Sequence, residues 1–237
     1  PVAALRCLVR HRDQLVEAAA SYVQRMQKAM VLMNLQLHNV ISDVTGVTGI
    51  AILRDIVAGQ TDPSVLARHR HPRCKATEAE SAASRTGHDR DEHLFVLRQA
   101  LEIYDFYQEK LRACDMEIET RIHALEASCD PVEGRLPASR VKTRRANEPG
   151  FEIRSPLFTL CGGVDLTQLP EIGAYGALKL ISEIGLDRSR WPSEKHFASW
   201  LSVAPRNQIS GGKLLRSRTQ PSANRAAKTL RMAAMSL

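Results

Sequence analysis

A serine beside two glycines is the residue of this sequence best suited to do chemistry. Ser210 precedes Gly211 and Gly212, and Arg206 and Lys213 flank the group. Glycines let backbone N–H groups approach an anion closely and adopt φ > 0, while flanking cations neutralise phosphate charge. The pattern therefore favours presentation of a hydroxyl group to a phosphate. The alternative is an ordinary Gly-Gly turn kept soluble by basic neighbours.

The positive charge of the chain is concentrated near its C-terminal end. The 237-residue sequence has a formal net charge of +7, yet residues 195–237 contain no Asp or Glu. A charge imbalance confined to one segment is typical of a protein that binds a polyanion, most often nucleic acid. Basic tails can also be merely solvated. The basic residues of this segment are Lys195, Arg206, Lys213, Arg216, Arg218, Arg225, Lys228 and Arg231.

Composition indicates a mainly helical protein of one or two domains, and we favour two. No run of eighteen apolar residues occurs, so we expect no membrane span. The first residues show no secretory signal, and the five scattered cysteines include no Cys-x-x-Cys pair, which favours a reduced, intracellular protein. The sequence lacks an initiating methionine and opens within a helical pattern, so we expect a fragment of a longer protein.

Two long helices are predicted to precede the basic segment. Apolar residues between 5 and 40 recur every three or four positions, as on an amphipathic helix. A heptad seam runs from Leu94 to Leu125, with Gln108 and Asp115 as polar seam positions. It could pack on the first helix or join subunits, and we favour a homo-oligomer, a dimer or tetramer. The first helix is expected to expose basic residues on its wetter side: Arg6, Arg10, His11, Arg12, Arg25 and Lys28.

Shorter signals lie between and after these helices. We expect a short helix over 50–58, capped by Thr48 and closed by Gly59, and a further helix starting at residues 62–64. The segment 68–75 contains three zinc-type ligands but no fourth, so we predict no metal site. These three ligands are His69, His71 and Cys74. Residues 130–156 are rich in proline and basic residues without an apolar period, which predicts a linker between domains 1–129 and 157–237.

The last domain is predicted to be a small helical DNA-binding domain. Residues 165–185 suggest a helix end, a turn and a new helix, as in a helix-hairpin-helix module whose turn, near Gly173, meets a phosphate. Its Pro-Glu-Ile-Gly replaces the usual Pro-Gly-Ile-Gly, and a plain helical hairpin is the alternative. We expect a helix after Ser193 that ends before Pro205. A last helix should present Asn224, Arg225, Lys228 and Arg231 beside small apolar residues.

The order of these motifs resembles a known family. "DLTQLPEIGAYGALKLISEIG", "WPSEKHFASWLSVAPRNQISGGK" and "SANRAAKTLRMAA" are similar to the C-terminal domain of the DEDD transposases, or bridge recombinases, of the bacterial insertion-sequence family one hundred and ten. The resemblance covers about residues 157–237. The segment "LRCLVRHRDQLVEAAASYVQRMQKAM" and the heptad helix resemble, more loosely, the end of that family's RuvC-like domain and its coiled-coil insertion.

The resemblance implies a recombinase that moves a DNA element with a structured non-coding guide RNA. Its nucleophilic serine maps onto Ser210, which would attack a DNA phosphodiester to form a phosphoserine link. The family's Asp-Glu-Asp-Asp site would bind Mg²⁺, but Asp43, Asp55 and Asp62 do not match that pattern, so we expect this site to lie upstream. The implied partners are donor and target DNA, the guide RNA and further subunits, and the implied location is the bacterial cytoplasm, at the nucleoid.

The resemblance also implies roles for the basic C-terminal segment. Arg206, Lys213 and Arg216 would lie nearest the scissile phosphate, with Gly211 and Gly212 at the turn. The flanking DNA backbone would be held by Arg218, Asn224, Arg225, Lys228 and Arg231. Two other functions stay open. One is a non-catalytic helical module that binds nucleic acid, and the other is a coiled-coil interaction protein whose charge is incidental.

Overall fold

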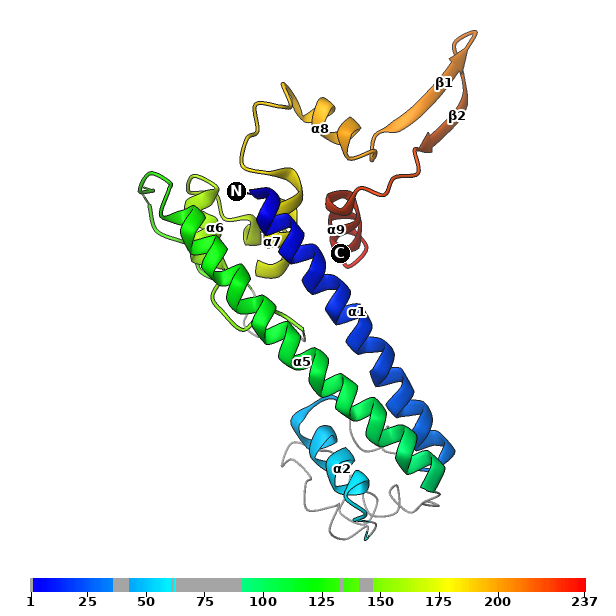
Figure 1. The fold of residues 1–237 in the computed structure, drawn as a ribbon. Coiled ribbons are helices and arrows are strands. Elements are labelled where there is room, and N and C mark those ends of the chain that lie inside the picture. Colours follow the sequence, from blue (N-terminus) through cyan, green and yellow to red (C-terminus); the bar gives the residue numbers. More distant parts are fainter. Residues whose placement is uncertain (1, 36–42, 61, 63–90, 133, 141–146) are drawn as a thin grey trace. The chain divides into compact units, whose positions relative to one another are not determined.

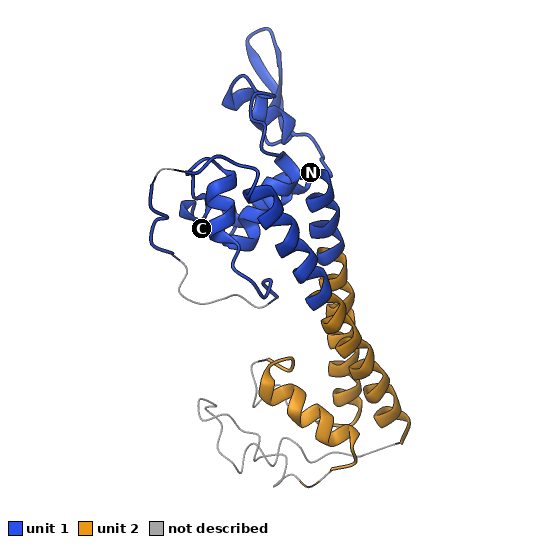
Figure 2. Ribbon diagram, turned by 60° about the vertical axis from the view of Figure 1, so that its left-hand side comes forward, with its two compact units in different colours: residues 1–12, 112–237 blue, residues 13–111 orange. Residues whose placement is uncertain are grey.

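The computed structural model describes the 237-residue chain except residues 1, 36–42, 61, 63–90, 133 and 141–146. The predicted helix start at 62–64 and the zinc-type ligands of segment 68–75 therefore lie almost entirely outside the described residues. The chain forms two compact units (Figure 2), of which unit 1 comprises residues 1–12 and 112–237 and unit 2 comprises residues 13–111. Both long helices, α1 (Val2–Leu32) and α5 (Asp91–Glu126), contribute to both units.

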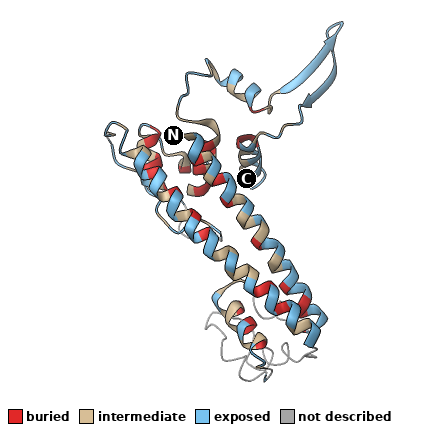
Figure 3. Cartoon of the chain, in the orientation of Figure 1, coloured by how far each residue is buried: buried red, intermediate tan, exposed pale blue. Residues whose placement is uncertain are grey.

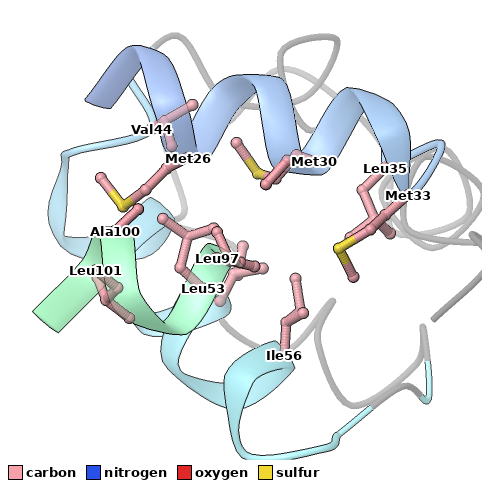
Figure 4. Packing of buried hydrophobic residues seen from close by; sticks show 12 residues of the cluster. Met26, Met30, Met33, Leu35, Val44, Leu53, Ile56, Leu97, Ala100 and Leu101 are labelled. Atoms are coloured by element: carbon pink, nitrogen blue, oxygen red, sulfur yellow. The ribbon is translucent and has the colours of Figure 1, made fainter. Parts of the chain in front are cut away.

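Unit 2 is a small helical core in which α1 and α5 pack with α2 (Val47–Val57). Figure 4 shows the methionines of α1 facing the apolar side chains of α2 and α5. The unbranched methionine side chain fills irregular gaps, which suits a core built from three helices. The fully buried residues of this core are Met26, Met33, Ile52, Leu53, Ile56 and Leu97.

The predicted short helix is present, but its cap differs from the prediction. Gly46 is the N-cap of α2, so Thr48 lies inside the helix and the prediction that Thr48 caps it is wrong. Gly49 explains the close packing here, because a Cβ on Gly49 would lie 2.2 Å from the Val44 carbonyl oxygen. Gly59 closes the helix with φ of +87°, as predicted.

The heptad seam of α5 is buried within the chain. In unit 2, Leu97 and Leu101 join the core described above. In unit 1, Ile118 and Ile122 are fully buried, and Cys114 Sγ donates to the Leu8 carbonyl oxygen of α1. The predicted long helices are therefore confirmed, and α1 occupies the seam of α5. Association of further subunits stays a prediction.

The remainder of unit 1 contains several short helices and a hairpin. The helices are α6 (Arg154–Leu160), the 3-10 turn η2 (Leu166–Gln168), α7 (Ala174–Ile184), α8 (Glu194–Trp200) and α9 (Arg225–Ala234). Helix α7 contacts α6, η2 and α9, and Ala226 and Ala227 of α9 are fully buried. The described chain is mainly α-helical, as predicted (Figure 1).

A β-hairpin follows α8, which the sequence did not predict. Strand β1 (Pro205–Ser210) pairs antiparallel with β2 (Lys213–Thr219). Every residue of both strands is exposed (Figure 3). A strand with no buried face need not alternate apolar and polar residues, which is the pattern that identifies a strand in a sequence. The two glycines of this segment form the turn of a two-stranded ribbon.

Candidate nucleic-acid interface

Ser210 lies at the end of β1, directly before the turn of the hairpin. Gly211 and Gly212 form the turn with φ of +56° and +75°. Two successive positive φ angles are typical of the type I′ turn, whose twist matches that of antiparallel strands and which favours glycine. Ser210 is paired with Lys213 across the strands. The glycines therefore set the hairpin geometry and bring a cation opposite the hydroxyl group.

An irregularity in the pairing sorts the side chains of the hairpin. Gln208 pairs with Arg216, but its neighbour Ile209 pairs with Leu214, so Leu215 is an extra residue in β2. Such a bulge interrupts the alternation of faces on its own strand. Lys213 and Arg216, three residues apart, therefore come to the same face. This basic face carries Arg206, Gln208 and Ser210 of β1 and Lys213, Arg216 and Arg218 of β2.

The basic face has the electrostatics of an anion site. Arg206 lies directly opposite Arg218, and like charges in that position destabilise a strand pair. The four cations of the basic face make no hydrogen bond or ion pair with any residue that the structure describes. A polyanion on this face would supply the missing counter-charge, and it would lie beside the exposed Ser210 hydroxyl group.

The polar residues predicted on the last helix divide into two groups, those that bind the chain itself and those that do not. Arg231 donates to the Ser202 carbonyl oxygen at 3.2 Å. Asn224 caps α9 by accepting from the Ala227 N–H and also donates to the Trp200 carbonyl oxygen. Both residues thus tie α9 to the end of α8, just before the hairpin. Arg225 and Lys228 are exposed and have no side-chain partner within the described part of the chain, and their predicted contact with nucleic acid stays a prediction.

An aromatic cluster lies at the base of the hairpin. The rings of Trp191, Phe197 and Trp200 lie 5.0–5.9 Å apart, centroid to centroid. Ring pairs at such separations stabilise a small structure beyond their burial alone. Trp200 lies five residues before the start of β1, and its carbonyl oxygen accepts the Asn224 hydrogen bond. The cluster is thus adjacent in sequence to the start of the ribbon.

The predicted phosphate contact at Gly173 has a carboxylate beside it. Gly173 is the N-cap of α7, and a Cβ on Gly173 would lie 3.3 Å from Glu148 Oε1. A helix N-terminus attracts negative charge, and here the Glu148 carboxylate supplies that charge. Glu171 occupies the position of the missing motif glycine and still adopts φ of +59°. The turn thus keeps a left-handed backbone without glycine, and a role for Gly173 in binding stays a prediction.

Sequence reasoning missed a buried network that holds the segment before α7. Arg154 forms an ion pair with Asp165, whose side chain is 3% exposed, and donates to the Pro137 carbonyl oxygen at 2.7 Å. Burial by itself raises the pKa of Asp165, but hydrogen bonds from Arg154, Thr167 and Gln168 outweigh it and hold that pKa well below its usual range. One sequence signal for this network was available. Asp165 lies two residues before Thr167, and this is the spacing at which an aspartate side chain accepts a backbone N–H in an Asx turn.

Three of the basic residues of α1 that were predicted on its wetter side bind the chain itself, whereas His11, Arg25 and Lys28 are exposed as predicted. Arg12 is 2% exposed and its Nε donates to Asp115 Oδ1 at 2.5 Å, so its predicted exposure is wrong. Burial alone lowers the pKa of Arg12, but the hydrogen bond with Asp115 outweighs it and raises that pKa. Arg6 Nε donates to the Ser182 carbonyl oxygen at 2.7 Å, and Arg10 pairs with Glu183. These contacts satisfy the C-terminal end of α7.

The described residues offer no site for the Mg²⁺ ion that the family resemblance implies. No group of three or more His, Cys, Asp or Glu side chains among them could hold a metal ion. No acidic or imidazole side chain in the described part of the chain hydrogen-bonds to Ser210 either. The residues present therefore do not fit a metal-activated serine by themselves.

Comparison with known proteins gives one finding. Residues 165–237 match the family model described as "Transposase IS116/IS110/IS902 family". This range contains α7, the hairpin and α9, and it lies within the range 157–237 expected from the sequence motifs. No curated protein and no solved structure matches the chain. None of the helices in the described residues combines the length and hydropathy that a bilayer span requires. The family match supports a transposase function for a mobile element.

Proposed function

We propose that this chain is part of a DNA transposase in which Ser210 forms a covalent phosphoserine link with DNA. One observation carries the proposal: the exposed Ser210 shares a hairpin face with four cations and no acidic residue. The family match over residues 165–237 supports transposition as the process. The proposed partners are donor and target DNA, a structured non-coding guide RNA, and further copies of the protein.

The proposed reaction exchanges one phosphodiester for another. Ser210 Oγ forms a bond to the phosphorus of a DNA strand, and the bond from phosphorus to the 3′ oxygen breaks. The proton of the serine hydroxyl is balanced by the proton that the released 3′ hydroxyl gains. A 3′ hydroxyl of another strand then attacks the phosphoserine and releases the serine. The bond energy is preserved, so religation needs no ATP. Arg206, Lys213 and Arg216 would stabilise the charge on the phosphate.

The test compares two serines of the same hairpin. Ser210 lies on the basic face, whereas Ser217, paired with Asn207, lies on the opposite face. The intact protein, expressed from its full reading frame, is incubated with labelled DNA, denatured and examined for a covalent adduct, which peptide mass spectrometry then locates. Ser210→Ala should abolish the adduct and strand exchange while sparing DNA binding, and Ser217→Ala should retain all three. Unchanged recombination by Ser210→Ala would refute the assignment.

A non-catalytic nucleic-acid-binding module is the second candidate. It is favoured by the absence, within the described residues, of any acidic or imidazole partner for the Ser210 hydroxyl group. Under this function the cations of the hairpin and α9 hold a nucleic-acid backbone and no adduct forms with any DNA. Salt-dependent binding of DNA by the intact protein, without an adduct in wild type, would select this candidate.

A further inference from the structure

The second face of the hairpin is apolar near its tip. Ile209, Leu214 and Leu215 lie on the side opposite Ser210, because Leu214 pairs with Ile209 and the bulge adds Leu215 beside it. Their exposed fractions are 66%, 57% and 68%. No residue in the described part of the chain covers them. Three large aliphatic side chains exposed together near the tip of a ribbon form a contiguous apolar patch, which is typical of a binding surface.

The charge of the surroundings indicates what binds this apolar face. Lys213 and Arg216 directly flank Leu214 and Leu215 in the chain, and residues 195–237 contain no acidic residue. Any partner of the apolar face therefore meets a rim of positive charge. Nucleic acid is the class of ligand that combines regularly spaced negative charge with flat apolar surfaces, the faces of its bases.

Paired bases hide these surfaces in the stack. Apolar side chains reach them where a base step is opened, and proteins that insert leucine or isoleucine into DNA use this contact. A ribbon with cations on one face and aliphatic side chains on the other fits between two separated strands. Its basic face can follow the backbone of one strand while its apolar face covers bases of the other.

We infer that the hairpin β1–β2 is a strand-separating wedge, with Ile209, Leu214 and Leu215 contacting unpaired DNA bases and the basic face holding the backbone of the opposite strand. The inference rests on the proposed function, since it takes DNA as the ligand. It adds a substrate preference: the hairpin binds locally opened DNA in preference to intact duplex. Strand exchange needs such opening, because the joined strands must leave their original partners.

The experiment measures affinity for two probes that differ only in base pairing. One is a DNA duplex, and the other is the same duplex with a central unpaired bubble that carries 2-aminopurine at its edge. Wild-type protein should bind the bubble about tenfold more tightly, and the 2-aminopurine fluorescence should change on binding. The double variant Leu214→Ser, Leu215→Ser should lose the preference and the fluorescence change. It should retain the affinity for intact duplex and its salt dependence, because the four cations are unchanged.

Met232→Ser is the matched control, since Met232 has the same exposed fraction as Leu214, 57%, and lies on α9. This control should behave as wild type, and circular dichroism should show all variants folded. Equal binding of both probes by wild type, or a preference that survives the double variant, overturns the inference. A wild-type dimer that the double variant dissociates in sedimentation also overturns it, because the apolar face is then a protein interface. Failure of wild type to bind either probe refutes the proposed function instead.

Discussion

Glu171 carries backbone strain that a glycine would remove. Its φ of +59° places a residue with a Cβ in the left-handed region, which costs roughly 1–2 kcal/mol. We therefore expect Glu171→Gly to raise the free energy of unfolding by about 1 kcal/mol, the gain being reduced by the greater freedom of glycine in the unfolded chain. Urea unfolding followed by circular dichroism measures this change.

Glu171→Ala is the control for this prediction. It removes the same carboxylate but keeps the Cβ, so it should leave the left-handed strain in place and give no stabilisation. Equal stabilisation by alanine and glycine would show that loss of the carboxylate, and not relief of the backbone, is responsible.

Asp165 should make the free energy of unfolding of unit 1 depend on pH in the acidic range. Its pKa in the folded protein lies below its value of about 3.9 in an unfolded chain. The stabilisation is therefore fully present above about pH 4 and is lost as pH falls towards the folded-state pKa. Asp165→Asn leaves Arg154 buried without a counter-charge, so at neutral pH it should lower the free energy of unfolding by about 3 kcal/mol.

Urea unfolding at neutral and acidic pH measures the difference between wild type and Asp165→Asn. That difference should shrink as pH falls below about 4, because the unfolded wild-type chain then takes up a proton on Asp165 that the folded protein does not bind. A difference that is constant across this range would mean that Asp165 acts through packing and not through its charge. Asp187→Asn is the comparison variant. Asp187 is exposed and accepts hydrogen bonds from Ser189, two residues away, so its replacement should lower the free energy of unfolding much less than Asp165→Asn does.

Arg12 and Asp115 show how far a single residue can be interpreted from the sequence. The heptad pattern predicts Asp115 as a polar residue on the seam, and Asp115 forms a buried ion pair there with Arg12. Helical periodicity alone places Arg12 on the wet side of its helix, because it treats every arginine as solvated. The partner that makes its burial favourable comes from a helix about a hundred residues later, and one sequence without an alignment does not reveal that pairing.

At the scale of an element, the hairpin should dominate the salt dependence of DNA binding. Each phosphate contact contributes about 0.9 to the slope of log affinity against log salt for duplex DNA. Arg216 lies on the basic face, so Arg216→Gln should reduce the slope by about 1 and weaken binding to all sequences alike. Fluorescence anisotropy over a series of salt concentrations measures both effects.

Arg112→Gln is the matched control for this charge change. Arg112 is exposed on α5, far along the chain from the hairpin, and its loss removes the same unit of charge. It should leave the slope unchanged. An equal fall in slope for both variants would indicate that the net charge of the protein, and not the basic face, determines its affinity for DNA.

The elements of the last domain were predictable to different degrees. Helix α8 begins after Ser193, as predicted, although the Ser193 side chain makes no capping hydrogen bond. Asn224, predicted to lie on the last helix, is instead the N-cap of α9. The strands were not predicted, since both of their faces are exposed and the bulge at Leu215 breaks the alternation of β2. The candidate site residues Arg206, Ser210, Lys213 and Arg216 lie close together in the sequence, but only strand pairing brings them to one face. Their role stays a prediction.

At the scale of the whole molecule, the two compact units do not follow the chain in order. Both α1 and α5 contribute to each unit, so a unit contains segments from distant parts of the sequence. Composition shows where a linker-like segment lies, and it predicted boundaries at 129 and 157. It does not show where packing density changes within a continuous helix. The sequence-based boundaries therefore stay predictions, whereas the mainly α-helical class was predicted correctly from periodicity.

The hairpin has two outer edges, and within the described residues neither edge is paired with another strand. Such edges are templates on which a second copy of the same ribbon can add its own strands and start an aggregate. The cations of β1 and β2 oppose this at low salt by mutual repulsion between copies. The residues proposed to hold DNA thus also keep concentrated protein dispersed. Purification in high salt, or neutralisation of these cations, should expose the protein to self-association through this ribbon.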